Sequence, residues 1–258
     1  MATLAKSFYD EQYLQDEYAR PVAANEHGAY FALSQFVECY ELHHQRCLEV
    51  GCGRGAFQDL VVDYTGVDIS DTVRRHLRKP FVQASATELP FADGEFDALW
   101  SVWTLEHVKR PEAALREIRR VLRTGGLAFL WPAWQCRSWA AQGYPVRPYT
   151  DFDWKGKIIK ASIPLRNSIF YRALKVFPNR LVRFCEWAGK REPTQLACQT
   201  LAPNRDHYWM SDSDAVNSLD PFEVILWFVS RGDECLSLPT SLSQLLVRTG
   251  PLVISVNK

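Results

Sequence analysis

The stretch that decides the fold is LEVGCGRG at residues 48–55, a short apolar segment that runs into three closely spaced glycines. The segment GVDIS follows at residues 66–70, and its acidic residue, Asp68, lies seventeen positions after Gly51. Glycines permit positive φ angles and a close approach of backbone to ligand, and a helix that begins after such a turn offers free N–H groups. A carboxylate at the end of the next strand can accept hydrogen bonds from both hydroxyls of a ribose. Together the two segments predict a nucleoside-binding site.

Apolar segments alternate with helical patterns on both sides of this turn. The expected strands are 47–50, 64–68, 81–84, 96–102, 127–131, 234–238 and 252–256. The expected helical pieces are the N-terminal segment 1–45, a compact helix at 56–61, and further pieces at 71–78, 111–122 and 221–231. The pair Gly125-Gly126 is expected to end the helix at 111–122. Such alternation is typical of βαβ units, so we predict one α/β domain with a mainly parallel sheet.

Length and composition limit the class of protein. The chain has 258 residues, 47% of them hydrophobic and 23% charged, which argues against a disordered chain. No apolar run approaches the roughly 18 residues that span a bilayer, and the first residues lack the apolar core of a signal peptide. We therefore expect a cytoplasmic enzyme. The seven scattered cysteines are expected to be reduced thiols, and we expect no metal site because no Cys/His pair has suitable spacing.

The net charge of zero conceals two unlike parts. Residues 135–192 hold twelve bases and four acids, a net charge of +8 (12 − 4), so the remainder of the chain carries −8. The neutral total argues against a dedicated nucleic-acid binder, because such domains are usually strongly basic.

Two nucleoside cofactors compete for the predicted site. Gly51, Gly53 and Ala56 satisfy the GxGxxA pattern of NAD(P)-binding proteins, so an oxidoreductase is an alternative. Against it, Glu49 precedes the glycines and would repel a pyrophosphate. S-adenosylmethionine instead carries a cationic amino group and a sulfonium, and has no phosphate. This comparison favours S-adenosylmethionine.

Four motifs in order give the chain a resemblance to the class I S-adenosylmethionine-dependent methyltransferases, and to the bacterial group related to the ubiquinone and menaquinone biosynthesis methyltransferases. They are residues 48–55, 66–70, ASATELPF at 84–91 with DGEFD at 93–97, and LEHV at 105–108 followed by Pro111 and residues 119–126. The resemblance covers about residues 46–133. It implies a Rossmann-like fold with a seven-stranded sheet and S-adenosylmethionine as cofactor.

The resemblance also implies roles for single residues. Glu49 would hold the methionine amino group, Gly51, Cys52 and Gly53 would lie under the cofactor, and Asp68 would bind the ribose. The adenine would pack on Ile69 and be recognised by Ser85 and by the backbone of Ala86, and Ser101 and Val102 would line the side of methyl transfer. Many relatives have Asp where this chain has Ser85, so adenine recognition here would depend more on packing.

An oxygen or nitrogen acceptor of the methyl group can need a base, and histidine is the natural base near neutral pH. His107 is the first candidate because it follows the fourth strand, although it could instead cap a helix or merely line the pocket, and Glu106 is its rival as the base. Asp206, His207 and Tyr208 could also reach the acceptor or could form a surface loop, and Tyr9, Tyr13 and Arg20 could cover the cofactor.

We interpret residues 134–208 as an aromatic, basic insertion after the fifth strand. It could be a lid over a small anionic or amphipathic acceptor, because arginines bind carboxylates and aromatic rings form apolar walls. It could touch a membrane surface, since Ile169, Phe170, Leu174 and Phe177 lie among Arg166, Arg172 and Lys175. It could also simply pack on the sheet. A non-catalytic cofactor-binding module is a further alternative, and the sequence leaves the oligomeric state open.

Overall fold

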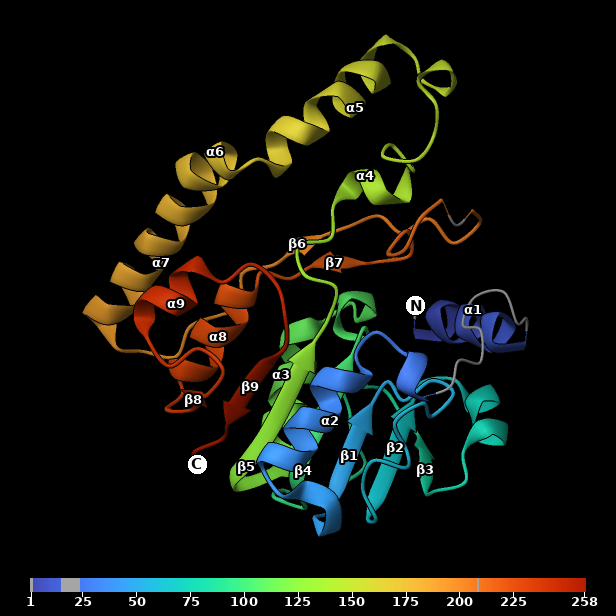
Figure 1. Cartoon of the computed structure of the whole chain (residues 1–258), viewed down its shortest axis with the longest axis vertical. Helices are drawn as coiled ribbons and strands as arrows, with labels where there is room; N and C mark the ends of the chain where they lie inside the picture. Colours follow the sequence, from blue (N-terminus) through green and yellow to red (C-terminus); the bar gives the residue numbers. More distant parts are fainter. Residues whose placement is uncertain (1, 15–23, 208) are drawn as a thin grey trace.

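The computed structural model describes residues 2–14, 24–207 and 209–258. One seven-stranded sheet with the order β3-β2-β1-β4-β5-β9-β8 forms the centre of the protein (Figure 1). Its strands are β1 (Cys47–Val50), β2 (Tyr64–Asp68), β3 (Phe81–Gln83), β4 (Phe96–Val102), β5 (Leu122–Trp131), β8 (Glu234–Cys235) and β9 (Leu252–Ser255). The first five are parallel, whereas β9 runs antiparallel to both β5 and β8. The Rossmann-like α/β fold and the mostly parallel sheet are therefore confirmed.

Helices cover both faces of the sheet. The α-helices in the described part of the chain are α1 (Ala2–Leu14), α2 (Tyr30–Cys39), α3 (Pro111–Val121), α4 (Ser138–Ala141), α5 (Trp154–Asn167), α6 (Ile169–Tyr171), α7 (Phe177–Lys190), α8 (Pro221–Val229) and α9 (Ser241–Leu246). A π-helical turn, Arg172–Val176, joins α6 to α7, and a small hairpin of β6 (Gln199–Thr200) and β7 (Asn217–Ser218) precedes α8. None of the described helices is long and apolar enough to cross a membrane.

The alternation of side chains along β4 shows how the two layers of core form. Ala98, Trp100 and Val102 pack with α2 on one face, and Leu99 packs with α3 and α8 on the other. Successive residues of a strand point to opposite faces, so Ser101 shares the face of Leu99. This placement matters for the site, because Ser101 is fully buried on that face.

Two local expectations were wrong. Residues 56–61 form turns rather than a helix. Gly51, Gly53 and Gly55 all have positive φ, so the short connection between β1 and β2 consists of consecutive turns. The helix at 111 ends at Val121, and Gly125-Gly126 lies within β5. There the register slips between two pairs of residues, Phe96–Leu122 and Ala98–Leu127, so the glycines occupy a bulge instead of a helix end.

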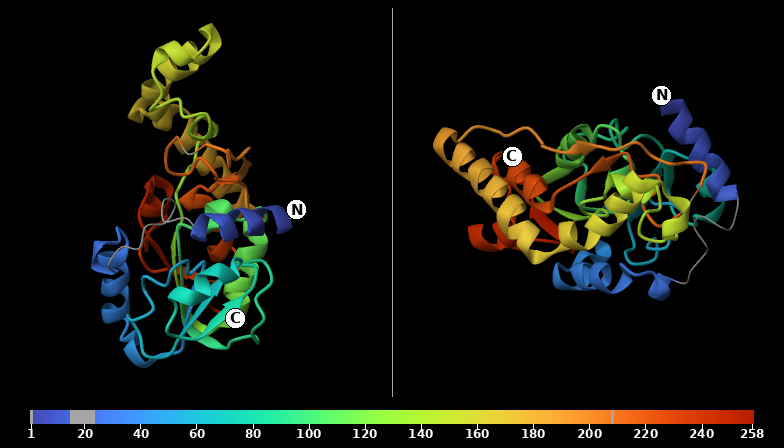
Figure 2. Two further views of the ribbon diagram at one scale, coloured as in Figure 1. Left: turned by 90° about the vertical axis from the view of Figure 1, so that its right-hand side faces the viewer. Right: turned by 90° about the horizontal axis from the view of Figure 1, so that it is seen from above.

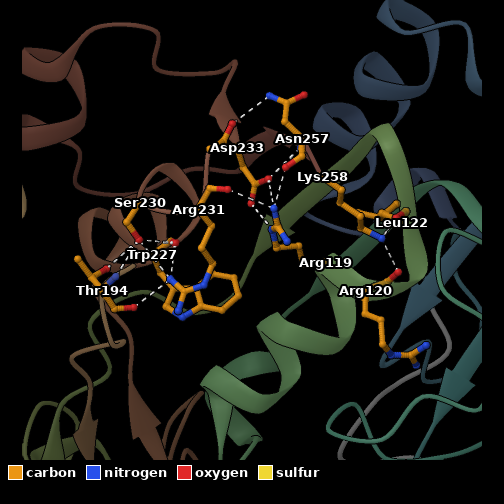
Figure 3. Close-up of polar contacts among 11 residues, drawn as sticks. Arg119, Arg120, Leu122, Thr194, Trp227, Ser230, Arg231, Asp233, Asn257 and Lys258 are labelled. Carbon is orange, nitrogen blue, oxygen red and sulfur yellow. Dashed lines mark hydrogen bonds and ion pairs between the residues drawn. The ribbon is translucent and has the colours of Figure 1, made fainter. Parts of the chain in front are cut away.

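A polar cluster fastens the last strand to α3 and α8 (Figure 3). Arg119 donates to both carboxylate oxygens of Asp233 at 2.7 and 3.1 Å and to the Asn257 carbonyl. Arg231 lies over the Trp227 ring at 3.9 Å, and Lys258 donates to the carbonyls of Arg120 and Leu122. These contacts stabilise the antiparallel edge of the sheet, which lies far from the glycine turn.

Most of the predicted insertion lies outside the sheet, beyond the carboxyl ends of the strands. Figure 1 shows α4 and α5 above the sheet and α7 descending toward α8 and α9. The limits 134–208 and the N-terminal segment 1–45 stay predictions, as no observation tests these boundaries. All seven cysteines are free thiols, as expected.

Candidate active site

A deep cleft opens at the carboxyl ends of β1, β2 and β4. Its volume is about 1920 Å³, and its walls include the glycine turn, Asp68 and His107. Pockets for one small ligand usually measure roughly 300–1,000 Å³. The cleft therefore has room for a nucleoside cofactor together with a second, smaller molecule.

Asp68 ties the glycine turn to the end of β2. Its Oδ2 accepts from Gly53 N at 3.0 Å, and its Oδ1 accepts from Ser70 N at 3.0 Å. Gly51 N and Cys52 N both donate to the Val67 carbonyl, which fixes the turn over the same strand. Each carboxylate oxygen keeps a lone pair for a ligand. Burial raises the pKa of Asp68 to about 6, so the group is a carboxylate at neutral pH.

The position of Gly51 leaves no space for a side chain, because Thr104 packs against it. Its φ is +78°, and a Cβ there would overlap the Thr104 side chain. Gly53 has a φ of +47°, and a Cβ on it would face the Tyr13 hydroxyl at 3.3 Å. The turn is thus covered by Thr104 on one side and by α1 on the other.

Glu49 is the second acidic group of the cleft, and it is 2% exposed. Tyr64 donates its hydroxyl to Glu49 Oε2 at 2.5 Å. Burial raises the pKa of Glu49 to about 8, although the Tyr64 hydrogen bond acts in the opposite direction. A buried carboxyl without a cationic partner among the described residues is suited to a cationic ligand group, which would restore its charged form.

The next wall carries the residues expected on the adenine side. Ile69, Ser85 and Ala86 all line the cleft, together with Thr87, which the sequence analysis did not single out. Ser85 Oγ accepts from Thr87 N at 3.2 Å and lies 2.9 Å from the Thr87 hydroxyl. The Ser85 hydroxyl therefore forms hydrogen bonds within its own turn.

Ser101 and Val102, at the end of β4, place their side chains on opposite faces of the sheet. Val102 and Cys52 line the cleft, but Ser101 does not. The expectation that Ser101 lines the transfer side was wrong, because the two-residue period of the strand turns its side chain toward the face of α3.

His107 lies in the same cleft and is 15% exposed. Its Nδ1 is 3.2 Å from Asp214 Oδ2, and its Nε2 is 3.8 Å from Glu106 Oε1. Tyr9 donates its hydroxyl to the same Asp214 oxygen at 3.0 Å. A histidine beside a carboxylate is the usual arrangement of an oriented base.

Glu106 is fully buried, and its Oε1 accepts from Ala133 N at 3.0 Å. Burial raises its pKa above the ordinary value, and the nearby His107 opposes that shift. The contact with the Ala133 backbone favours a positioning role for Glu106 over the role of a base.

Sequence reasoning missed Asp214, which lies 107 positions from His107 (214 − 107). Two sets of hydrogen bonds bring the two together: Val216 N donates to the Glu106 carbonyl at 3.0 Å, and the side-chain amide of Asn217 donates to the carbonyls of Leu105 and Val108 at 2.8 Å each. The cluster of acids at 212–214 was the only sequence signal. Asp212 also lines the cleft, and burial raises its pKa.

Trp103 is a second missed residue of the cleft. It has a φ of +49° and stacks on His27 with ring centroids 4.6 Å apart. A bulky residue in this backbone region is strained, and such strain is concentrated at functional sites.

Tyr9 and Tyr13 of α1 both line the cleft, and their covering of the cofactor stays a prediction. Ser70 donates its hydroxyl to Asp10 Oδ1 at 2.6 Å, which fastens α1 to the end of β2. Arg20 and Tyr208 lie outside the described residues. Asp206 lines the cleft, whereas His207 stacks on Trp209.

Only the last part of the predicted insertion contributes to this cleft. Residues between Thr200 and Val216 line it, but none of the described residues from 134 to 199 does. Phe177, Phe184 and Trp187 of α7 instead pack against the main core. The helices α4–α7 therefore do not form a wall of the cleft.

A parallel sheet, a glycine turn after its first strand and a carboxylate at the end of its second define a Rossmann-like nucleoside-binding domain. A family model described as methyltransferase domain matches residues 48–130. The fatty-acid O-methyltransferase of Mycolicibacterium smegmatis is 30% identical over 189 residues, 66% of this chain and 68% of that protein. The ubiquinone biosynthesis O-methyltransferase of Dechloromonas aromatica is 25% identical over 199 residues, 70% of this chain and 79% of that protein.

A solved S-adenosylmethionine-dependent methyltransferase from Thermotoga maritima, described as a possible histamine N-methyltransferase, is 28% identical. The match covers 49% of this chain and 60% of that one, with a TM-score of 0.41. On the strength of the sequence relatives, the chain belongs to the class I S-adenosylmethionine-dependent methyltransferases.

S-adenosylmethionine is accordingly the cofactor, and the NAD(P) alternative is wrong. The residues of the cleft fit it. Glu49 offers a buried carboxyl to a cationic group, and Asp68 offers lone pairs beside the glycine turn.

Proposed function

We propose that the protein methylates an oxygen atom of a small amphipathic acceptor and that His107 removes the proton of that oxygen. The observation that carries the proposal is the His107–Asp214 contact of 3.2 Å inside the cleft that also holds Glu49 and Asp68. The relative named as an O-methyltransferase of ubiquinone biosynthesis supports an oxygen atom as acceptor, and the relative named for a fatty acid supports an apolar chain on the acceptor.

The role of the protein's own residues in the reaction is to accept a proton in a fixed geometry. Asp214 Oδ2 lies 3.2 Å from His107 Nδ1 and would orient the ring with its Nδ1–H toward the carboxylate, which leaves the lone pair on Nε2 for the acceptor hydroxyl. When bound, S-adenosylmethionine supplies an electrophilic methyl group. After transfer the proton stays on Nε2, and the imidazolium lies between Asp214 and Glu106, whose oxygens are 3.2 and 3.8 Å away.

The walls of the cleft support an amphipathic acceptor. Trp103, Trp209 and Met210 provide apolar surface, and Arg205 and Lys109 provide positive charge on the same cleft. Aromatic walls bind flat or long apolar groups, while Arg and Lys bind an acidic head group.

The test is methyl transfer from labelled S-adenosylmethionine to three acceptors: a hydroxylated aromatic compound, a long-chain carboxylic acid and a primary amine. We expect methylation of the hydroxyl, and His107→Gln and Asp214→Asn should lower kcat by about a hundredfold or more. The affinity for S-adenosylhomocysteine should stay within about twofold, because neither residue is placed against the cofactor. The matched control is His43→Gln, a half-exposed histidine outside the cleft.

Two results would contradict the proposal. Methylation of the carboxylic acid alone, unaffected by His107→Gln, would show that no proton is removed, since a carboxylate is already deprotonated at neutral pH. Tight binding of S-adenosylhomocysteine without turnover of any acceptor would favour a non-catalytic module.

A further inference from the structure

A helical arm, defined as Trp154–Lys190, projects from the domain without a described partner for its outer surface. Figure 1 shows α5 farthest from the sheet, and the left view of Figure 2 places the arm at the same end of the molecule. Only Gly156 and Arg180 of its 37 residues are buried. Arg180 donates to Asp220 and to the carbonyls of Leu245 and Val247, which anchors the base of the arm.

The arm exposes large apolar side chains. Of the eighteen exposed large hydrophobic residues in the described chain, eight lie in the arm. Ile169, Phe170 and Leu174 are 76%, 74% and 79% exposed. Large contiguous apolar patches are rare on soluble monomers and mark surfaces that bind something.

Neither of the other two interpretations of the insertion accounts for this surface. The arm lines no part of the cleft, so its apolar residues do not touch the acceptor there. The residues of α7 that pack on the core, Phe177, Phe184 and Trp187, are different from the exposed ones.

The charge of the arm indicates what covers it. It holds nine bases and one acid, Glu186, for a net charge of +8 (9 − 1). Among the described residues only Arg180 and Arg183 of these bases form ion pairs with carboxylates. Lys155, Arg166 and Lys175 are exposed beside the apolar side chains.

We infer that the arm docks on a lipid bilayer with anionic head groups, Phe170 and Leu174 entering the interface and the lysines and arginines contacting the head groups. Helices that combine bases with exposed large apolar residues bind in this way. A symmetric contact between the arms of two copies fits less well, because two arms of +8 would repel each other. The proposal does not depend on the nature of the methyl acceptor.

The experiment is co-sedimentation of the full chain with vesicles of pure phosphatidylcholine and with vesicles that also contain phosphatidylglycerol. We expect binding to the anionic vesicles only, weakened by salt. F170S/L174S should lower the partition coefficient by about tenfold or more, because two apolar side chains no longer enter the interface. The matched control is Phe31→Ser on α2, since Phe31 is 71% exposed but lies outside the arm.

A second variant separates charge from apolar contact. K155Q/R166Q/K175Q should lower binding about a hundredfold, as each charge near an anionic surface contributes about fivefold. R74Q/R78Q/R116Q removes three bases outside the arm and should bind as the wild type does. Melting temperature and S-adenosylhomocysteine affinity, measured for every variant, verify that the fold is intact.

Three outcomes would overturn the inference. The wild type could fail to sediment with anionic vesicles, or the arm variants could bind as strongly as the wild type. Light scattering could also show a dimer that F170S/L174S dissociates without any vesicle binding, which would assign the arm to a second copy of the chain.

Discussion

Glu49 makes the apo protein less stable as the pH rises. Burial raises the pKa of Glu49 to about 8 from an ordinary value of 4.5. The folded state therefore binds this proton more tightly than the unfolded state, and the stability that the proton confers is lost as the pH rises from 4.5 through about 8. Between about pH 6.5 and about pH 8.5 the unfolded state gains roughly 2.7 kcal/mol from ionisation and the folded state roughly 0.8, a net loss of about 2 kcal/mol.

The substitution Glu49→Gln removes the titrating group and keeps a similar shape. In urea unfolding, we expect the free energy of unfolding of the wild type to fall by about 2 kcal/mol more than that of the variant over this pH interval. Asp68 interferes little, because its pKa of about 6 means that its own loss is almost complete below this window. An equal pH dependence in the wild type and the variant would refute the assignment of a protonated Glu49.

Other perturbations probe the same cleft and the arm. At neutral pH, binding of S-adenosylhomocysteine should release a proton from Glu49, which calorimetry in buffers of different ionisation enthalpy detects as a buffer-dependent heat. Asp68→Ala should weaken S-adenosylhomocysteine binding at least about tenfold by titration, through the loss of charge-assisted hydrogen bonds; unchanged affinity removes Asp68 from the ribose role. Gly51→Ala should destabilise the fold by about 2 kcal/mol or more in urea, since positive φ alone costs roughly 1–2 kcal/mol and the new Cβ meets Thr104; an unchanged midpoint contradicts the contact. Arg180→Met should cost about 3 kcal/mol because it leaves a carboxylate and two carbonyls without their donor; a stability equal to the wild type would show that the arm is anchored elsewhere.

The sequence was sufficient for the parts of the fold that local patterns determine. The bounds of β1, β2 and β4 agree with the expected strands, because these segments are too short for helices and lie next to turn residues. The same reasoning placed Asp68 at a strand end beside the glycine turn. It failed at residues 56–61, where three positive φ angles in the preceding turn leave too little chain for a helix.

The acceptor side of the site could not be predicted in the same way. Asp214 reaches His107 only because the segment after β6 hydrogen-bonds to the turn at 105–107. Such a contact between distant segments leaves no spacing signal in a single sequence. Ser101 shows the converse limit, since its position at a strand end was correct but the strand period turned its side chain away from the cleft.

The net charge of zero is the sum of two charged parts of the chain, which lie in different places and have different requirements. With +8 on the arm, the remainder of the chain carries −8, and its cleft buries Glu49, Asp68 and Glu106. The carboxyl groups of the cleft can meet the cationic groups of the cofactor, but a frame of this charge would be repelled by an anionic bilayer. Screening limits both effects to about 8–10 Å at physiological salt. Because the arm projects beyond the sheet, its bases can approach an anionic surface while the acidic frame stays farther away, so one chain can meet both requirements.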